Sequence, residues 1–131
     1  MSDTPPNVGS VPWMDLTVPN AESVRGFYED VVGWTSTAVE MGDYEDWCMN
    51  APRDGKTVAG ICHARGVNSE QPAQWMMYIV VESLEQSVSR CRELGGEVLT
   101  EREGGGSQGP FAVIRDPAGA VCALYELPAA G

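Results

Sequence analysis

The sequence has few basic residues and no long apolar run. Lys and Arg number 8 in 131 residues, against 19 Asp and Glu, so the formal net charge is −11. Because phosphate groups bind to clusters of basic side chains, this balance argues against a nucleic-acid partner and against an anionic membrane surface. No apolar stretch approaches the roughly 18 residues of a transmembrane helix. Neither nucleic acid nor a membrane is therefore expected as a partner.

The N-terminal residues lack the apolar stretch of a secretion signal. Residues 1–10 are rich in Pro, Ser and Asn, which is typical of a flexible tail. We therefore expect a soluble, cytoplasmic protein. The 4 cysteines are widely spaced without a C-x-x-C pair, and the chain has 1 histidine, His63. Such cysteines are expected to be reduced, buried small hydrophobic residues, and a zinc site is not expected.

A strand–helix–strand–strand–strand pattern occurs twice. In the first half, alternation over 11–18 predicts a strand, and Asn20 and Gly33 bound a helix. The apolar stripe of this helix consists of Val24, Phe27, Tyr28 and Val31. Further strands are expected over 34–39, 47–50 and 57–64. The second half predicts strands over 75–81, 97–100, 111–115 and 120–127, and a helix that begins with a capping box at Ser83 and Gln86.

An offset of 63 residues relates the two halves. It places Leu16 on Ile79, Val18 on Val81 and Gly33 on Gly96. The identity between the halves is low, so the repeat rests on pattern and spacing. We expect one domain over 11–127, built from a module at about 11–65 and a second module at about 73–127. Short tails, 1–10 and 128–131, flank it.

Several short motifs occur in a fixed order along these two halves. They are Trp13-Met14-Asp15-Leu16, Phe27-Tyr28 with Gly33-Trp34, Val58-Ala59-Gly60-Ile61, Trp75, Tyr78-Ile79-Val80-Val81, Leu94-Gly95-Gly96 and Asp116-Pro117-x-Gly119. The ordered set resembles the vicinal oxygen chelate superfamily, which includes glyoxalase I, bleomycin-resistance proteins and extradiol dioxygenases, and within it the single-domain glyoxalase-like branch. The resemblance implies an α+β fold in which two tandem βαβββ modules form a cup-shaped mixed sheet with the helices outside. It also implies a homodimer, with the modules paired within one chain or swapped across the dimer.

Metal-using members of this superfamily place a ligand on the first and last strands of each half. The resemblance carries these positions to Trp13, Met76 and Ala123, and to a place at or next to Cys62. A glyoxalase-like site needs His and Glu there, whereas indole and alanine cannot coordinate a metal ion. We therefore predict a protein without a metal or another cofactor. His63 is the alternative counterpart if the register differs by one residue, but one histidine does not make a site.

Strand alternation predicts which side chains face the cavity that the resemblance implies. In the first half these are Trp13, Asp15 and Thr17. The expected ligand-binding residues are Trp13, Trp47, Met76, Tyr78, Phe111, Ala123 and Tyr125, with the facing of Trp47 and Phe111 left open. Aromatic and thioether side chains with few polar groups are typical of a small-molecule pocket, although ordinary core packing explains each aromatic residue equally well. We therefore predict a metal-independent protein that binds a small organic molecule, in resistance or in secondary metabolism.

Asp15 is the candidate catalytic residue. A carboxylate between aromatic side chains would have a raised pKa through desolvation and could act as a general base. The alternative function is therefore a lyase, isomerase or epimerase that uses Asp15, with Tyr78 or Tyr125 as its acid partner. A hydrogen-bonded or solvated strand carboxylate is the simpler interpretation.

Two further segments keep open interpretations. The loop over 104–109 matches G-x-G-x-x-G, but it does not follow a strand and open a helix, so a dinucleotide site is not expected. This loop is either a lid over the cavity or a plain hairpin loop. The acidic stretch Glu40, Asp43, Glu45 and Asp46 is either a solvated loop or an attractor for a cationic ligand.

Overall fold

The computed structural model describes residues 7–65, 72–103 and 109–127. The chain divides into two compact units. Residues 13–75 form the unit that we call the first module. Residues 76–131, together with residues 1–12, form the second module. Most of the predicted lid loop over 104–109, and the C-terminal tail after residue 127, lie outside the described residues.

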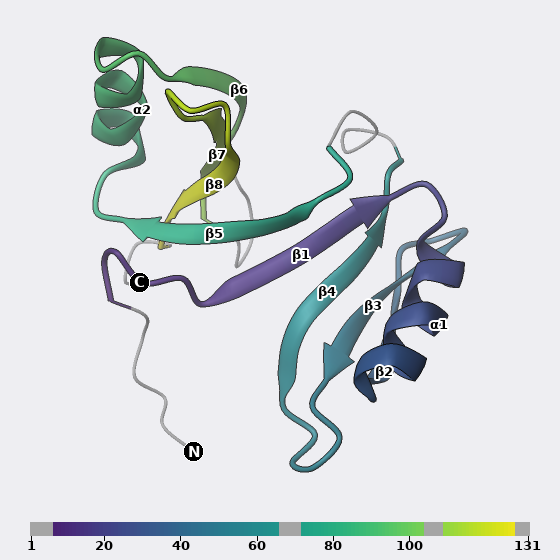
Figure 1. Cartoon of the computed structure of the whole chain (residues 1–131). Helices are drawn as coiled ribbons and strands as arrows, with labels where there is room; N and C mark the ends of the chain where they lie inside the picture. The colour runs from purple at the N-terminus through teal and green to yellow at the C-terminus, as the bar shows by residue number, and fades with distance from the viewer. Residues whose placement is uncertain (1–6, 66–71, 104–108, 128–131) are drawn as a thin grey trace. The chain divides into compact units, whose positions relative to one another are not determined.

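The first module is a four-stranded sheet with one helix. Its elements are β1 (Trp13–Val18), α1 (Ala21–Val32), β2 (Thr35–Glu40), β3 (Glu45–Asn50) and β4 (Thr57–His63). The strand order is β2-β3-β4-β1, in which β1 and β4 are parallel and the other pairs are antiparallel (Figure 1). The parallel pair requires a crossover, and this crossover contains α1.

The second module repeats this plan. Its elements are β5 (Trp75–Val81, whose first residue, Trp75, still belongs to the first module), α2 (Leu84–Glu93), β6 (Glu97–Arg102), β7 (Phe111–Arg115) and β8 (Val121–Glu126). The strand order is β5-β8-β7-β6, again with one parallel pair, β5 and β8 (Figure 1). Gly9 N donates a hydrogen bond to Val80 O, and Val80 N donates one to Ser10 O, so these N-terminal residues add to the edge of β5. Both modules are therefore βαβββ units, and the predicted α+β class is confirmed.

The offset of 63 residues holds in the strand register. Asp15 lies opposite Gly60 in the first module, and Tyr78 lies opposite Ala123 in the second. Each residue of the second pair is 63 positions after its counterpart in the first. The internal repeat that the spacing predicts is therefore present in the parallel strand pairs.

The two helices begin and end differently. Ser83 accepts a hydrogen bond from Gln86 N at 3.2 Å, as the capping box predicts. Asn20 is the N-terminal boundary residue of α1, as expected, but its side chain makes no capping hydrogen bond. Gly33 ends α1 in the left-handed region, at φ 86°. In the second module Gly95, from the Leu94-Gly95-Gly96 motif, adopts this conformation just after the end of α2, at φ 93°.

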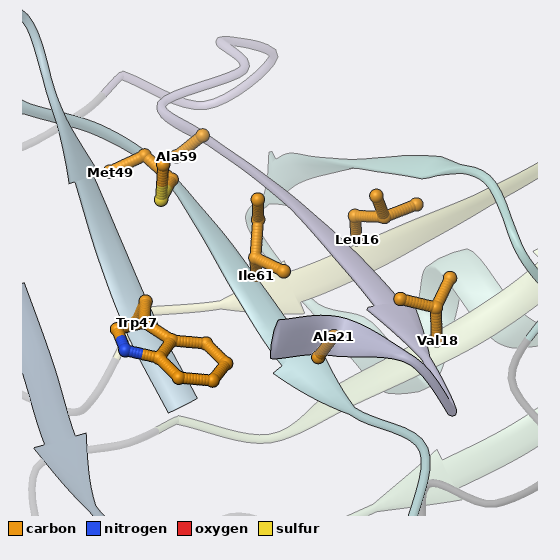
Figure 2. Packing of buried hydrophobic residues seen from close by; sticks show 7 residues of the cluster. All are labelled: Leu16, Val18, Ala21, Trp47, Met49, Ala59 and Ile61. Atoms are coloured by element: carbon orange, nitrogen blue, oxygen red, sulfur yellow. The ribbon is translucent and has the colours of Figure 1, made fainter. Parts of the chain in front are cut away.

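The core of the first module lies between α1 and the sheet. It consists of Leu16, Val18, Ala21, Trp47, Met49, Ala59 and Ile61 (Figure 2). Val24 and Tyr28 of the predicted helix stripe pack against it. Phe27 and Val31 are 56% and 64% exposed, because the apolar stripe of α1 is wider than the surface that the sheet covers.

The second module has a buried cluster on each face of its sheet. Leu84, Val88, Ala112 and Leu124 pack on the side of α2. Met76, Val113 and Ala123 form the cluster on the opposite side. No helix in the described ranges is long and apolar enough to span a membrane.

Candidate functional site

The helix-free face of the first module gathers polar and reactive side chains. Leu16 and Val18 of β1 face the core, so Trp13 and Asp15 lie on the other side of the sheet. The register places Gly60 of β4 opposite Asp15 and also opposite Cys48 of β3. Trp13 and Asp15 therefore share one face with Cys48 and Cys62, as the alternation predicts for the β1 residues.

Trp13 and Asp15 are joined by a hydrogen bond. Trp13 Nε1 donates to Asp15 Oδ2 at 3.1 Å, and both side chains are partly buried. The Cζ2 edge of the six-membered ring lies against β4 at Gly60, since a Cβ atom added there would lie 2.9 Å from Trp13 Cζ2. The hydrogen bond and this close approach together hold the indole in one place.

Cys62 is a poor nucleophile in this environment. Burial, followed by the negative charges of Asp15 and Asp46, raises the pKa of the Cys62 thiol from 9.0 to about 12. The thiol also donates a hydrogen bond to Asp46. Because the thiolate is the reactive form of cysteine, Cys62 stays protonated and unreactive at neutral pH. Cys48, Cys62, Cys91 and Cys122 form no disulfide, as expected, although they are partly rather than fully buried.

Asp46 was expected in a solvated acidic stretch, but it is only 9% exposed. Its Oδ1 accepts a hydrogen bond from His63 N at 2.9 Å and lies 3.4 Å from His63 Nδ1. The strand β3 begins at Glu45, earlier than the expected Trp47, and this extension brings Asp46 beside β4. The sequence did contain a signal for this burial, because Asp46 immediately precedes Trp47, the first residue of a predicted strand.

Trp47 and His63 lie on the side of α1. Trp47 is 7% exposed within the core, and the Arg25 guanidinium lies 4.7 Å from the centre of its ring. The His63 ring lies 5.5 Å from that of Trp47. Trp47 therefore does not share the face of Trp13 and Asp15. A hollow of about 510 Å³ is lined by the Trp47 indole, His63 and Arg25. Three residues of the predicted acidic stretch also line this hollow: Glu40, Asp43 and Glu45.

The other predicted ligand-binding residues share the helix-free face of the second module. They are Met76, Tyr78, Phe111, Ala123 and Tyr125. Met76 and Ala123 form the buried floor. The Tyr78 ring lies 6.4 Å from that of Phe111 and 6.4 Å from that of Tyr125. Burial raises the pKa of the Tyr125 phenol, so this side chain is neutral at physiological pH.

The register corrects one of the four positions that the resemblance assigns to metal ligands. Ala123 lies opposite Tyr78 and Gly60 lies opposite Asp15, so Gly60 is the counterpart of Ala123. The expected place, at or next to Cys62, was two residues too late. Cys62 corresponds instead to Tyr125. The sequence could have shown this, because the offset of 63 residues connects Gly60 to Ala123 directly.

The residues at these four positions do not fit a metal ion. Indole, glycine, thioether and methyl groups stand where His and Glu ligands are needed, at Trp13, Gly60, Met76 and Ala123. Among the described residues, no three His, Cys, Asp or Glu side chains gather in a way that could hold a metal ion. At the four positions that the resemblance assigns to metal ligands, the chain therefore has one aromatic ring and no His or Glu.

A further hollow lies on the second module, away from its helix-free face. It measures about 830 Å³ and is lined mainly by charged side chains, including Glu85, Arg92 and Glu101. None of the predicted ligand-binding residues lines it. Its charged lining differs from the mostly apolar lining of typical small-molecule sites.

Solved structures share the fold of this chain at low sequence identity. A hypothetical protein from Bacillus halodurans is 12% identical, with a TM-score of 0.60, and the match covers 95% of this chain and 99% of that one. A methylmalonyl-CoA epimerase from Mycobacterium tuberculosis is 17% identical, with a TM-score of 0.54, covering 92% of this chain and 89% of that one. These similarities establish the fold.

The sequence comparisons identify the family. An anthracycline biosynthesis protein, DnrV of Streptomyces peucetius, is 30% identical over 90% of this chain and 47% of its own length. The chain thus spans about half the length of this relative. Residues 10–124 match the profile of the Glyoxalase/Bleomycin resistance protein/Dioxygenase superfamily. With nearly the whole chain matched, this protein belongs to the glyoxalase/bleomycin resistance protein/dioxygenase superfamily.

Proposed function

We propose that this protein binds a small, flat aromatic molecule without the metal ion that other members of its family use. Each module offers proposed contacts of its own. They are Trp13 on the first module, and Met76, Tyr78, Phe111, Ala123 and Tyr125 on the second. Trp47 is left out because it belongs to the core beneath α1. Resistance and secondary metabolism are the processes in which such binding is expected.

The observation that carries this proposal is the indole at a metal-ligand position. Trp13 stands at a position that the resemblance assigns to a metal ligand, and its ring contacts Asp15 and closely approaches Gly60. A ring that is fixed before binding loses little conformational freedom when a ligand stacks on it. Stacked aromatic pairs gain free energy beyond the area that they bury. The first module therefore offers a surface suited to a flat ring system.

The second module supports the same ligand class. Tyr78, Phe111 and Tyr125 are arranged around the small side chain of Ala123, with ring centres 6.4 Å apart in each adjacent pair. Phenol groups add hydrogen-bonding atoms to an otherwise apolar surface, which is the usual composition of a ligand pocket. The Streptomyces peucetius relative, an anthracycline biosynthesis protein, points to the same class, because anthracyclines are flat polycyclic aromatic compounds.

Binding of quinizarin, a flat hydroxylated anthraquinone, tests the proposal. All 4 tryptophans lie in the first module, so quenching of their fluorescence reports contact with that module. We expect saturable quenching in the wild type, and about tenfold weaker binding in Trp13→Ala, since one aromatic contact contributes up to about 1.5 kcal/mol. The matched control is Trp34→Phe, because Trp34 packs with Tyr28 and Trp75 beside the core. Equal affinity of wild type and Trp13→Ala would remove Trp13 from the ligand site.

The second face and the absence of a metal are tested separately. Tyr78→Ala and Phe111→Ala should each weaken quinizarin binding, measured by calorimetry so that the signal does not depend on tryptophan. Binding should be unchanged after treatment with a chelator. A stoichiometric divalent ion found by elemental mass spectrometry, whose removal abolishes binding, would overturn metal independence.

A second candidate function is catalysis with Asp15 as general base. The supporting observation is the hydrogen bond from Trp13 Nε1 to the Asp15 carboxylate, on the side of the first-module sheet opposite α1. A lyase, isomerase or epimerase needs a base held in this way. Mass spectrometry of the molecule that co-purifies, before and after incubation, distinguishes the two functions. If the protein is an enzyme, Asp15→Asn should abolish turnover and keep affinity within a few-fold; unchanged turnover would exclude Asp15 from the mechanism.

A further inference from the structure

Gly60 and Trp13 approach each other more closely than a side chain would allow. A Cβ atom at Gly60 would lie 2.9 Å from Trp13 Cζ2 and 3.4 Å from Asp15 Cβ. Real Cβ atoms essentially never come within 3.0 Å of another group. Gly60 itself has no positive φ, so its backbone conformation does not demand glycine. The space above its Cα, which the indole uses, is therefore the reason for glycine at this position.

The internal repeat shows what the same place looks like without a tryptophan. Ala123 occupies the position of Gly60 in the second module, and Met76 occupies that of Trp13. A Cβ is accommodated there, because Ala123 is fully buried beside Met76 and Val113. The sheet geometry at this position is thus compatible with alanine. Only the first module, which carries the indole, has a residue without a Cβ at this position, Gly60.

We propose that Gly60 is a positioning residue that sets the orientation of the Trp13 indole and thereby selects flat ligands. This inference rests on the proposed function, because it concerns the surface on which the ligand stacks. The Cζ2 edge of the indole rests against β4 only while nothing projects from Gly60, because an added Cβ would lie 2.9 Å from Cζ2 and 3.7 Å from the next ring atom. Its N–H group then reaches Asp15, and its ring forms a platform for a planar aromatic molecule. A methyl group at Gly60 tilts the ring away from the strand, so that both the hydrogen bond and the platform are lost.

The substitution Gly60→Ala tests this inference. The indole N–H signal of Trp13 in a proton–nitrogen correlation spectrum, assigned by its loss in Trp13→Phe, should move upfield as the hydrogen bond to Asp15 breaks. Quinizarin affinity should fall about tenfold, as expected for the loss of one aromatic stacking contact. The matched control, Ala123→Gly, changes the equivalent position of the other module and should leave the Trp13 signal in place. An unchanged Trp13 signal in Gly60→Ala would overturn the inference.

A double-substitution cycle shows whether Gly60 acts through Trp13. Phenylalanine lacks the ring atom that meets the Cβ, so adding Gly60→Ala to Trp13→Phe should change neither affinity nor stability further. An additive loss would mean that Gly60 acts by another route, and the inference would fail. If Gly60→Ala alone does not fold, its recovery in the Trp13→Phe background supports the steric contact, and failure there refutes it.

The two proposals fail in different ways. If the wild type does not bind quinizarin, the proposed function is contradicted for this ligand class. The Trp13 signal in Gly60→Ala still tests the orientation of the indole. If the wild type binds and Gly60→Ala binds equally well, selection of the ligand by Gly60 is wrong, while the proposed function stands.

Discussion

The two modules have the same order of elements and differ in the side chains on their helix-free faces. The first module places Trp13, Asp15, Gly60 and Cys62 at positions where the second places Met76, Tyr78, Ala123 and Tyr125. In the first module the Trp13 ring is hydrogen-bonded to the Asp15 carboxylate and lies against Gly60. The set in the second module is a continuous layer of aromatic, thioether and methyl groups.

The difference indicates that the strand scaffold does not depend on these side chains. The parallel pairs β1–β4 and β5–β8 have the same register, although the side chains on their helix-free faces differ in size and polarity. What both modules retain is an apolar layer between helix and sheet, with Leu16 and Val18 in one and Leu84 and Leu124 in the other. The helix side is therefore apolar in both modules, while the composition of the helix-free side differs between them.

The largest expected effect comes from the core of the first module. Ile61 is fully buried, and Ile61→Ala should reduce the free energy of unfolding by about 3 kcal/mol through lost burial and a residual cavity. Val80 is fully buried in the second module, and Val80→Ala removes fewer methyl groups, so we expect about 2 kcal/mol.

Urea denaturation followed by two probes sharpens this comparison. Tryptophan fluorescence reports the first module alone, and far-ultraviolet circular dichroism reports both. Ile61→Ala should lower the fluorescence midpoint more than Val80→Ala does. The control is Val58→Ala on the same strand, where the side chain is 43% exposed and little change is expected. A fluorescence midpoint shifted equally by all three variants would contradict the assignment of the core.

The next largest effect is the dependence of stability on pH at Cys62. Its pKa is raised from 9.0 to about 12 in the folded chain, first by burial and then by Asp15 and Asp46. Below the lower value, both folded and unfolded chains keep the proton. Above it, the unfolded chain releases the proton while the folded chain does not, so stability falls with rising pH by on the order of 1 kcal/mol per pH unit from this group.

Comparison with Cys62→Ser isolates this contribution from the other titrating groups. The stability difference between wild type and variant, from urea titrations at several alkaline pH values, should shrink as the pH rises from 9.0 towards 12. Alkylation gives a second measurement, because Cys62 should react with iodoacetamide far more slowly in the folded than in the unfolded chain. Stability curves that run parallel over this range would show that the pKa of Cys62 is not raised.

The sequence predicted which segments form strands and, for most of them, which side of the sheet their side chains face. It did not predict the contact between Gly60 and Trp13. Period-two alternation placed Trp13 and Asp15 opposite Leu16, and placed Tyr78 and Ala123 on one face, because a strand fixes these directions locally. The facing of Trp47 stayed open, since its strand was predicted too short to reveal the alternation around it. The role of Gly60 depends on a ring that approaches from another strand, and such a contact leaves no local pattern.

The helix starts offer a smaller contrast between the modules. Ser83 Oγ accepts a hydrogen bond from Gln86 N, and Glu126 Oε1 accepts one from Leu84 N at 2.8 Å, so α2 is capped twice by side chains. Ser83→Ala should destabilise the protein by about 1 kcal/mol. Asn20→Ala should cost less, because Asn20 makes no side-chain capping bond at the start of α1. Equal losses in thermal unfolding would indicate that Asn20 caps α1 in solution.

The smallest expected effects concern how each module uses arginine. Arg115 in the second module pairs with Glu97 at 2.7 Å, and the two side chains are 43% and 64% exposed. Arg25 in the first module lies over the Trp47 ring, at 4.7 Å. Arg115→Ala should cost about 0.5 kcal/mol at low salt and almost nothing at about 1 M salt, because exposed ion pairs are weak and screened.

Arg25→Ala should cost about 1 kcal/mol, and this loss should persist in salt. The arginine covers the ring with its guanidinium and with the apolar part of its side chain, and neither the stacking nor the packing is removed by screening as an exposed ion pair is. Urea titrations of both variants at low and high salt make the comparison, with Arg53→Ala, in the exposed turn before β4, as the control. A salt-sensitive loss in Arg25→Ala would mean that its interaction with nearby carboxylates, such as Glu22, outweighs its contact with Trp47.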